Sequence, residues 1–454
     1  MDGRRTTEPS DKDGSASGPD GHDALTGLAD RRLFQHRLGW MLDASARQPE
    51  RPALLMVDLD RFKLVSDSFG RRAGDALLCL VAGRLRATLR EGDLLGRIGG
   101  DEFAVALVAG GAATVLAARL ADILARPYLV QGKIATIGAS IGIAIAGDGV
   151  EADELIRHAD LALHHAKADG GRAFRVFDPA MDEQARQRQL LESDLRKALP
   201  LRQLELHYQP QINLQTQRLV GFEALLRWRH PERGLVPPVQ FIPLAEEIGL
   251  IVPIGEWALR TACKQAARWG GALTVAVNVS AVQLQDGARL VKAVRGALDA
   301  AALPGHCLEV EITESALVRR ADETLAALHA LREMGVAVSM DDFGTGYSSL
   351  SQLRSFPFTK IKIDRSFIQD LENNPEGMAV VRAIVALGTT LGMSTTAEGV
   401  ETAGQAAIVR AEGCIHMQGY LMSRPLPPAE AERFVVLYDA SQGGRFREEH
   451  RSDA

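Results

Sequence analysis

The stretch from Val336 to Leu350 constrains the fold of this chain more than any other. Its sequence, V-A-V-S-M-D-D-F-G-T-G-Y-S-S-L, starts as an apolar run and changes abruptly to two adjacent carboxylates, Asp341 and Asp342. Gly344 and Gly346 follow, and glycine lets a backbone turn tightly. This order predicts a buried strand, a turn and the start of a helix. Because side chains alternate along a strand, two neighbouring acids can share one site only at its end.

Other apolar runs of strand length in the second half of the chain carry polar residues at or near their ends. With the opening stretch they make eight strand candidates, and helix-length segments separate most of them. Eight strands alternating with helices predict a TIM-like (β/α)8 barrel, whose functional residues gather at the C-terminal strand ends. The other seven runs are Leu204–Gln209, Leu219–Leu225 with Glu223, Leu273–Val279 with Asn278, Cys307–Thr313 with Glu311, Thr359–Asp364 with Lys362, Ser394–Glu398, and Cys414–Gln418.

The acids at these strand ends predict a metal site. Two unit charges at ~4 Å repel by roughly 4 kcal/mol at an effective dielectric of 20. Several carboxylates in one barrel mouth therefore need cations to stay ionised together. Oxygen ligands with one amide suit hard ions such as Mg²⁺ or Mn²⁺. Solvated acids at the starts of loops are the alternative for any single residue, but the whole set favours a site.

Composition limits the class of protein. A chain of 454 residues is long enough for two or three domains, and a net charge of −6 gives no sign of a nucleic-acid polymer or an anionic membrane as partner. The four cysteines are far apart and lack metal-type spacing, which indicates reduced thiols and a cytoplasmic protein. No apolar run reaches the ~18 residues that span a bilayer. Polar residues follow Arg4-Arg5, so we expect no export signal.

The first half of the chain predicts an α+β domain from 23 to 178. A Gly99-Gly100 pair between two apolar runs is typical of a hairpin. Mixed with helices, such hairpins indicate a sheet covered by helices. We expect flexible tails at 1–22 and 441–454, a helical linker at 179–200 and the barrel at 201–440. Within the first domain the predicted helices are 28–42, 73–89, 112–125 and 153–168, and the predicted strands are 53–59, 94–107 as a hairpin, and 134–146.

Seven ordered motifs in the second half resemble the EAL domain family, which hydrolyses cyclic di-GMP. They are G-F-E-A-L-L-R-W (221–228), V-N-V-S (277–280), E-I-T-E (311–314), D-D-F-G-T-G (341–346), K-I-D (362–364), A-E-G-V-E-T (397–402) and Q-G-Y (418–420).

The resemblance implies a role for each matching residue. Glu223, Asn278, Glu311 and Asp341 would bind metal, and Asp342 and Glu398 would complete a two-metal site. Lys362 would hold or activate the attacking water, with Glu223 and Glu398 also counted among the catalytic groups. Gln418 would orient the site, and Gln209 and Arg227 would contact the dinucleotide. Glu314 would support the loop that follows Asp342. The expected product is linear 5′-pGpG.

The first domain resembles the GGDEF family of diguanylate cyclases, whose fold is a ferredoxin-like palm related to nucleotide cyclases. The motifs are D-A-L-T-G-L (23–28), D-L-D-R-F-K (58–63), A-G-D (73–75), R-I-G-G-D-E-F (97–103), A-S-I-G-I-A (139–144) and A-D-L-A-L-H-H-A-K (159–167). By this resemblance Asp58 and Asp101 would hold Mg²⁺ and Glu102 would assist catalysis. The GTP-binding residues would be Lys63, Ser66, Asp75, Gly99, Gly100 and Lys167. Arg90 and Asp93 match an inhibitory cyclic di-GMP site, although an exposed ion pair is the alternative.

Three positions depart from the GGDEF pattern. Ser66 stands where an Asn usually contacts guanine, and Arg71 replaces a common His. Gly171 lies where an Arg usually holds phosphate, although Arg172 could substitute for it. Losing a charged hydrogen bond costs roughly 1.5–3 kcal/mol. These departures predict weaker GTP binding or slower synthesis.

Three functions remain open at this stage. The first is a cyclic di-GMP phosphodiesterase with a regulatory or weakly active cyclase domain. The second is a bifunctional enzyme, and the third is a catalytically silent receptor for the dinucleotide. The complete acidic set argues against the third, while Ser66 and Gly171 favour the first. The family resemblance also implies a homodimer, and a regulatory protein partner of unknown identity is conceivable.

Overall fold

The structure is a computed structural model that describes residues 21–45, 50–314, 316, 321–344, 353 and 355–440. The chain divides into two compact units, Met1–Gln189 and Leu190–Ala454. Residues 1–20 of the predicted N-terminal tail, the whole predicted C-terminal tail and Gly346 lie outside the described residues. His22, placed in the predicted tail, is half-buried and forms a β-bridge with Ala29.

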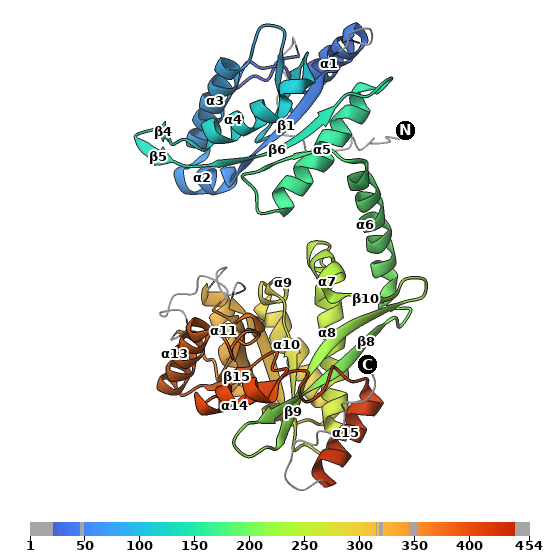
Figure 1. The fold of residues 1–454 in the computed structure, drawn as a ribbon, viewed down its shortest axis with the longest axis vertical. Helices are drawn as coiled ribbons and strands as arrows, with labels where there is room; N and C mark the ends of the chain where they lie inside the picture. The colour runs from blue at the N-terminus through green and yellow to red at the C-terminus, as the bar shows by residue number, and fades with distance from the viewer. Residues whose placement is uncertain are drawn as a thin grey trace, which may run out of the picture. The chain divides into compact units, whose positions relative to one another are not determined.

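The first unit is a five-stranded sheet in the order β2-β3-β1-β6-β7, covered by helices (Figure 1). Both neighbours of β1 run antiparallel to it, as a palm-like α+β fold requires. The strands are β1 (Ala53–Asp60), β2 (Leu94–Arg97), β3 (Glu102–Leu107), β6 (Gly138–Ile145) and β7 (Phe174–Val176), and β4 (Tyr128–Val130) pairs with β5 (Lys133–Ala135) as a separate hairpin. The helices are α1 (Arg31–Ser45), α2 (Phe62–Phe69), α3 (Arg71–Thr88), α4 (Ala113–Ala125) and α5 (Ala152–Ala168).

Strand β1 places its side chains in two separate cores, one on each face of the sheet. Leu55 and Val57 pack with residues of α3 and α4. Leu54 and Met56 pack instead with residues of α1 and α5. Because side chains alternate along a strand, a continuous apolar run fits only a strand that is covered on both faces. The two acids of this strand, Asp58 and Asp60, lie in its last three positions, on either side of the buried Leu59.

Two local features differ from the sequence-based expectation. The single strand predicted for 134–146 is divided into β5 and β6. The break falls between Ala135 and Gly138, because β5 pairs only with β4, across a turn at Gln131 and Gly132 with φ angles of 50° and 79°, while β6 pairs with β1 and β7. Helix α2 and strand β7 were not predicted, since both are too short to give a clear periodic pattern.

The second unit is an eight-stranded closed barrel with one additional hairpin strand (Figure 1). The sheet order is β10-β9-β11-β12-β13-β14-β15-β16-β8, and pairing between β8 and β9 closes it. Strand β8 runs antiparallel to both of its neighbours, unlike the other barrel strands. The strands are β8 (Leu204–Asn213), β9 (Leu219–His230), β10 (Gly234–Val236), β11 (Thr274–Asn278), β12 (Leu308–Thr313), β13 (Ala337–Phe343), β14 (Lys360–Ile363), β15 (Ser394–Ala397) and β16 (His416–Gln418).

The main core of this unit lies between the strands and the surrounding helices. In β12, Leu308, Val310 and Ile312 belong to that core, so Glu309 and Glu311 must face the barrel interior. The apolar residues of this strand therefore pack against the helices, and its two glutamates lie inside the barrel. The helices are α6 (Pro179–Ala198), α7 (Pro238–Glu247), α8 (Ile251–Arg268), α9 (Ala281–Leu284), α10 (Gly287–Ala301), α11 (Ala321–Glu333), α13 (Pro375–Leu391), α14 (Ala403–Ala411) and α15 (Pro428–Ala440).

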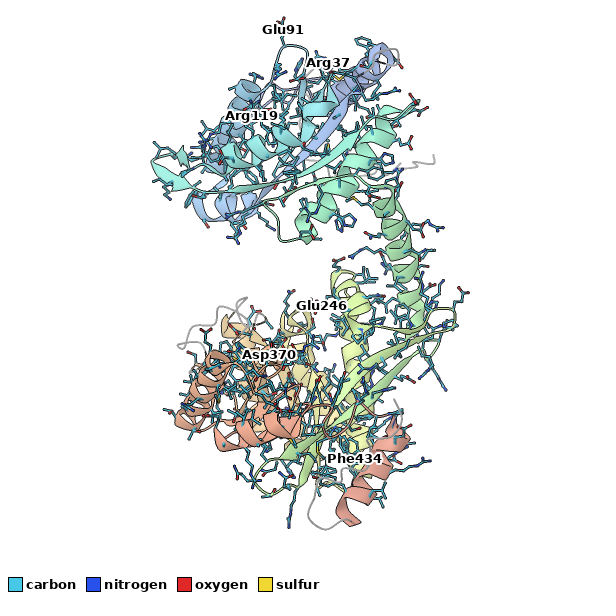
Figure 2. All side chains as sticks on the ribbon, viewed as in Figure 1. Arg37, Glu91, Arg119, Glu246, Asp370 and Phe434 are labelled. Atoms are coloured by element: carbon cyan, nitrogen blue, oxygen red, sulfur yellow. The ribbon has the colours of Figure 1, made fainter. Side chains whose placement is uncertain are left out.

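Aromatic contacts add to this core. Phe222 of β9 packs against Trp269 and against Phe434 of α15, which is labelled in Figure 2, with ring centroids 4.6 Å and 6.1 Å apart. Within the described parts of the chain, no helix combines the length and the apolar character of a membrane span.

We predict that Gly142→Ala destabilises the first unit selectively. A Cβ at this position of β6 would lie 2.0 Å from the Ala159 carbonyl oxygen of α5, so the helix would have to move off the sheet. Such overpacking should cost about 2–3 kcal/mol. Denaturant unfolding followed with probes in each unit should show one weakened transition. Gly83→Ala is the control, because an added Cβ there meets nothing within 4 Å; an equal effect of both variants would contradict the packing argument.

Candidate functional site

A buried ammonium group lies at the centre of the barrel mouth. Lys362 of β14 is fully buried, and its Nζ contacts carboxylates from four other segments of the barrel. The Nζ–oxygen distances are 2.6 Å to Glu398, 2.7 Å to Glu311, 3.0 Å to Asp341 and 3.6 Å to Glu223. The strand-end acids predicted from the sequence therefore converge on one point, although they are distant in the chain.

Amide side chains fix the orientation of Glu223. Asn278 Nδ2 donates to Glu223 Oε1 at 2.6 Å, and Gln418 Nε2 donates to Glu223 Oε2 at 2.5 Å. Gln418 Nε2 also donates to Gln209 Oε1, while Gln418 Oε1 accepts from Gln211 Nε2, each at 3.0 Å. Three glutamines from β8 and β16 thus form a chain behind one carboxylate.

The two adjacent aspartates reach the same site through an irregularity in β13. The strand continues to Phe343 instead of ending at Met340, and its register with β14 shifts between these two residues. Asp342 has a φ of 53°, a left-handed conformation that few non-glycine residues adopt. Strict alternation is broken there, so both side chains can approach Glu398. One oxygen from each of Asp341, Asp342 and Glu398 lies within 4.8 Å of the others.

Burial and mutual charge shift the pKa values of these groups in different directions. Burial raises the pKa of Glu398 to about 8, although Lys362 lowers it in part. Burial and the charge of Glu223 raise the pKa of Glu311 well above its ordinary range. Burial would also raise the pKa of Glu223, but Lys362, Gln418 and Asn278 lower it overall. Burial opposes the charge of Lys362, yet its acidic neighbours hold its pKa well above the ordinary value.

Two predicted residues, Arg227 and Glu314, and a further acid, Glu246, lie on elements that adjoin the site. Arg227 lies four strand positions from Glu223, hence on the same face of β9. Burial lowers the pKa of Arg227, and the charge of Glu223 opposes that shift. Glu314 Oε2 accepts a hydrogen bond from the Gly344 backbone at 3.3 Å, which ties it to the end of β13. Glu246 of α7, labelled in Figure 2, accepts from Ser280 Oγ at 2.5 Å.

The residues present suit divalent cations. The described side chains around Lys362 bring five carboxylates and one ammonium together, leaving excess negative charge. Glu311 Oε1 is buried and has no hydrogen-bond partner among the residues that the structure describes. A buried carboxylate oxygen without a partner is costly unless a ligand satisfies it. Oxygen donors of this kind are the ligands that Mg²⁺ and Mn²⁺ prefer.

The first unit has a smaller acidic site at the ends of β1 and β3. Asp58 is opposite Glu102 in the antiparallel register, and Lys167 Nζ lies 2.6 Å from Asp58 Oδ2. Asp101 lies in the turn after Gly99 and Gly100, and burial together with the Asp58 charge raises its pKa. These predicted Mg²⁺ ligands are therefore neighbours.

The other predicted nucleotide residues of this unit are placed differently. Lys63 is exposed on α2, and Ser66 and Asp75 are half-buried on α2 and α3. The Ser66 hydroxyl would lie 3.2 Å from a Cβ built on Gly74, so α2 and α3 are close here. Arg90 donates its backbone N–H to Asp93 Oδ2 at 2.9 Å, which orders the predicted inhibitory motif as a turn.

The position of Gly171 explains one departure from the expected pattern. Its φ is 74°, and a Cβ there would lie 3.1 Å from Asp60 Oδ1. An arginine at this position would therefore be strained. Arg172 also has a left-handed φ of 55°, and its backbone N–H donates to Asp60 Oδ2 at 2.9 Å. The exposed Arg172 side chain packs over Gly138, at the start of β6.

Comparison with known families assigns both units. The model of the EAL domain matches residues 192–425, and the model described as diguanylate cyclase, GGDEF domain, matches residues 21–173. The chain belongs to the EAL domain family. A GGDEF domain precedes its EAL domain, and EAL domains depend on divalent metal, in agreement with the acidic cluster around Lys362.

Relatives and solved structures show how far the similarity extends. Bifunctional diguanylate cyclase/cyclic di-GMP phosphodiesterase MucR of Pseudomonas aeruginosa is 45% identical, covering 89% of this chain and 60% of MucR. Cyclic di-GMP phosphodiesterase NbdA of the same organism is 42% identical, covering 92% of this chain and 54% of NbdA. The structure titled PaMucR phosphodiesterase, c-di-GMP complex, is 49% identical with a TM-score of 0.51, covering 53% of this chain and 99% of that one. The chain thus spans little more than half the length of these curated relatives.

Sequence reasoning missed three contributors to the two sites. Gln211 completes the glutamine chain of the EAL domain, and its spacing of two residues from Gln209 could have indicated a shared face. Asp160 of the GGDEF domain lies near Glu102; burial and that charge raise its pKa. Arg97 binds both oxygens of Asp23 at 3.0 and 3.1 Å, linking the signature hairpin to the start of the domain.

We predict that the metal-free protein loses stability as the pH rises from 4.5 to 8. Glu398 has a pKa of about 8 when folded and 4.5 ordinarily, so over this interval the folded state holds a proton that the unfolded state has released. The free energy of unfolding should fall by on the order of 2–4 kcal/mol across it. Urea unfolding in a chelator at several pH values measures this fall. Glu398→Gln should flatten the profile, and an unchanged slope in that variant would exclude Glu398 as its source.

Proposed function

We propose that the EAL domain is a cyclic di-GMP phosphodiesterase that hydrolyses the dinucleotide to linear pGpG with two divalent cations. The convergence of Glu223, Glu311, Asp341 and Glu398 on the Lys362 ammonium carries this proposal. A receptor that only binds the dinucleotide would not need so many acids in one buried cluster. The names of MucR and NbdA, both similar over about nine-tenths of this chain, support the substrate class.

Glu223, Asn278, Glu311, Asp341, Asp342 and Glu398 would hold Mg²⁺ or Mn²⁺. When bound, such ions lower the pKa of water and neutralise charge on phosphoryl oxygens. The chain's own residues have separate tasks. Lys362 stays protonated, so its Nζ–H groups donate to the attacking water and stabilise developing negative charge. Glu398 Oε1 lies 2.6 Å from Lys362 Nζ, so the ammonium would hold this carboxylate in position beside the cations and the attacking water.

The glutamines and Arg227 would orient the substrate. Gln209 accepts from Gln418 and donates to the Ser423 carbonyl, and Gln418 accepts from Gln211, so the orientations of both amide groups are fixed before the dinucleotide arrives. Arg227 would contact the dinucleotide from β9, where the guanidinium can meet a phosphate or a guanine. Glu314, through its bond to Gly344, would keep the end of β13 and its two aspartates in place.

The GGDEF domain would bind GTP and either regulate hydrolysis or synthesise cyclic di-GMP slowly. Asp58 and Asp101 would hold Mg²⁺ with the nucleotide, Glu102 would assist, and Lys167 would meet the phosphates. Ser66 and the strained position of Gly171 favour weak synthesis. A bifunctional enzyme is the second candidate, because Asp58, Asp101, Glu102 and Lys167 are all present and adjacent.

The domain boundaries and the assembly are part of the same proposal. We place the GGDEF domain at 23–178, a helical linker at 179–200 and the EAL domain at 201–440. A cyclase reaction joins two GTP molecules held by two GGDEF domains, so synthesis would require a homodimer. Incubating purified protein separately with GTP and with cyclic di-GMP, each with Mg²⁺ or Mn²⁺, and separating the products by chromatography distinguishes the two candidates.

We predict that Glu223→Ala abolishes hydrolysis without unfolding the EAL domain. Removing a metal ligand should lower kcat at least ~100-fold and weaken metal binding. Formation of pGpG, calorimetric titration with Mn²⁺ and thermal unfolding measure the three effects. Glu376→Ala, at an exposed position in the first turn of α13, is the control and should keep the wild-type rate. Full activity with normal metal uptake in Glu223→Ala would remove the assigned role.

We predict that Asp101→Ala alters GTP-dependent behaviour but spares basal hydrolysis. Asp101 lies in the turn of the GGDEF hairpin, in a compact unit separate from the barrel. Any synthesis of cyclic di-GMP should disappear, and any effect of GTP on hydrolysis should weaken. The rate of pGpG formation without GTP should stay within about twofold of wild type. Loss of all hydrolysis together with unfolding would argue against independent domains.

A further inference from the structure

A second polar layer lies inside the barrel beneath the Lys362 site. Each of its members precedes a site residue by two positions, on the same strand or, for Glu398, one residue past the strand end, and residues two apart on a strand face the same side. The layer therefore lies in the barrel interior, one step further from the mouth. Its members are Glu309 on β12, Ser339 on β13, Lys360 on β14, Thr396 on β15 and His416 on β16.

An ion pair crosses this layer. Lys360 Nζ lies 2.5 Å from Glu309 Oε2, and both residues are buried. Strands β12 and β14 are not neighbours, because β13 lies between them in the sheet. The pair therefore spans the interior of the barrel, parallel to the contact between Lys362 and Glu311 one layer above. Two lysines and two glutamates, spaced by two residues on the same strands, form two stacked cross-links.

The lower layer has unused capacity to accept hydrogen bonds. Glu309 Oε1, Ser339 Oγ, Thr396 Oγ1 and His416 Nδ1 are buried and have no partner among the described residues. Burial lowers the pKa of His416 to about 4, so its ring is neutral at ordinary pH. A buried polar atom without a partner is normally satisfied by water or by another polar group. An ammonium group that entered this layer would therefore find several acceptors.

The inward face of β14 therefore adjoins two polar environments that lie one layer apart. The upper one contains the four carboxylates of the site, and the lower one contains Glu309. We propose that Lys360 is a positioning residue that keeps the Lys362 ammonium in the upper environment. It does so by occupying Glu309 and by repelling a second ammonium from the lower layer. The effect on rate rests on the proposed phosphodiesterase function, but the effect on the position of Lys362 does not.

The proposal predicts an asymmetry between three variants. Lys360→Met leaves Glu309 without its partner, so Lys362 should turn toward Glu309; kcat should fall at least about tenfold with KM changed less than about threefold. Glu309→Gln keeps the positive charge of Lys360 below Lys362 and should lower kcat less than about threefold. The double variant removes both charges and should recover most of the kcat lost in Lys360→Met. A crystal structure of Lys360→Met should show Lys362 Nζ contacting Glu309.

Arg382→Met is the matched control, because it removes the cation of another ion pair in the same domain. Arg382 is exposed, and its Nε lies 2.7 Å from Glu412 Oε2. It should leave kcat unchanged. A double variant as impaired as Lys360→Met, or full activity in Lys360→Met, would overturn the proposal. If Lys360→Met does not fold, the kcat of Glu309→Gln tests the proposal instead. A fall in kcat as large as that caused by Lys362→Ala would overturn the proposal, and a near-normal kcat would support it. If wild-type protein does not hydrolyse cyclic di-GMP, the proposed function fails, and the crystallographic position of Lys362 in Lys360→Met alone tests this inference.

Discussion

The buried ammonium of Lys362 is the interaction on which the EAL site depends. An isolated charge in this position would be strongly unfavourable, and so would four carboxylates without a counter-ion. Together they compensate in part: the acids raise the pKa of Lys362, and Lys362 lowers that of Glu223 below its ordinary value. The compensation is incomplete, because Glu311 and Glu398 keep raised pKa values. Protons take the remaining negative charge in the metal-free protein, and divalent cations are suited to replace them.

The period of a β-strand explains how one barrel accommodates both this charge and a hydrophobic core. In β12, leucine, valine and isoleucine alternate with two glutamates, so the apolar side chains meet the helices and the acids face inward. The same spacing recurs in β14 with Lys360 and Lys362. Closure of the sheet through β8 and β9 then brings the inward faces within hydrogen-bonding distance. The polar interior is thus a direct result of strand alternation, and its cost is offset by ion pairs stacked in two layers.

Much of this arrangement could be predicted from the sequence, because apolar runs that end in acids indicate strand ends in a barrel. The TIM-like barrel, the palm-like first domain and both family assignments are confirmed. The left-handed backbone of Asp342 could not be predicted, since it depends on a register shift against β14 that only the folded sheet imposes. The pairing of Glu309 with Lys360 was missed for a similar reason. Both residues lie in predicted strands, but their contact passes across the inner face of β13 and exists only once these strands are assembled in the sheet.

The two domains use a lysine in contrasting ways, and the contrast bears on their division of labour. Lys362 is 1% exposed and held by several acids, so the EAL site is organised before the substrate arrives. In the GGDEF domain the Lys167 side chain is 41% exposed. Among the described residues, it forms an ion pair with Asp58. A half-exposed pair contributes little stability and is readily exchanged for another partner. The Lys167–Asp58 pair is therefore suited to exchange, with a phosphate for Lys167 and a cation for Asp58, which agrees with the nucleotide-binding role proposed for this domain.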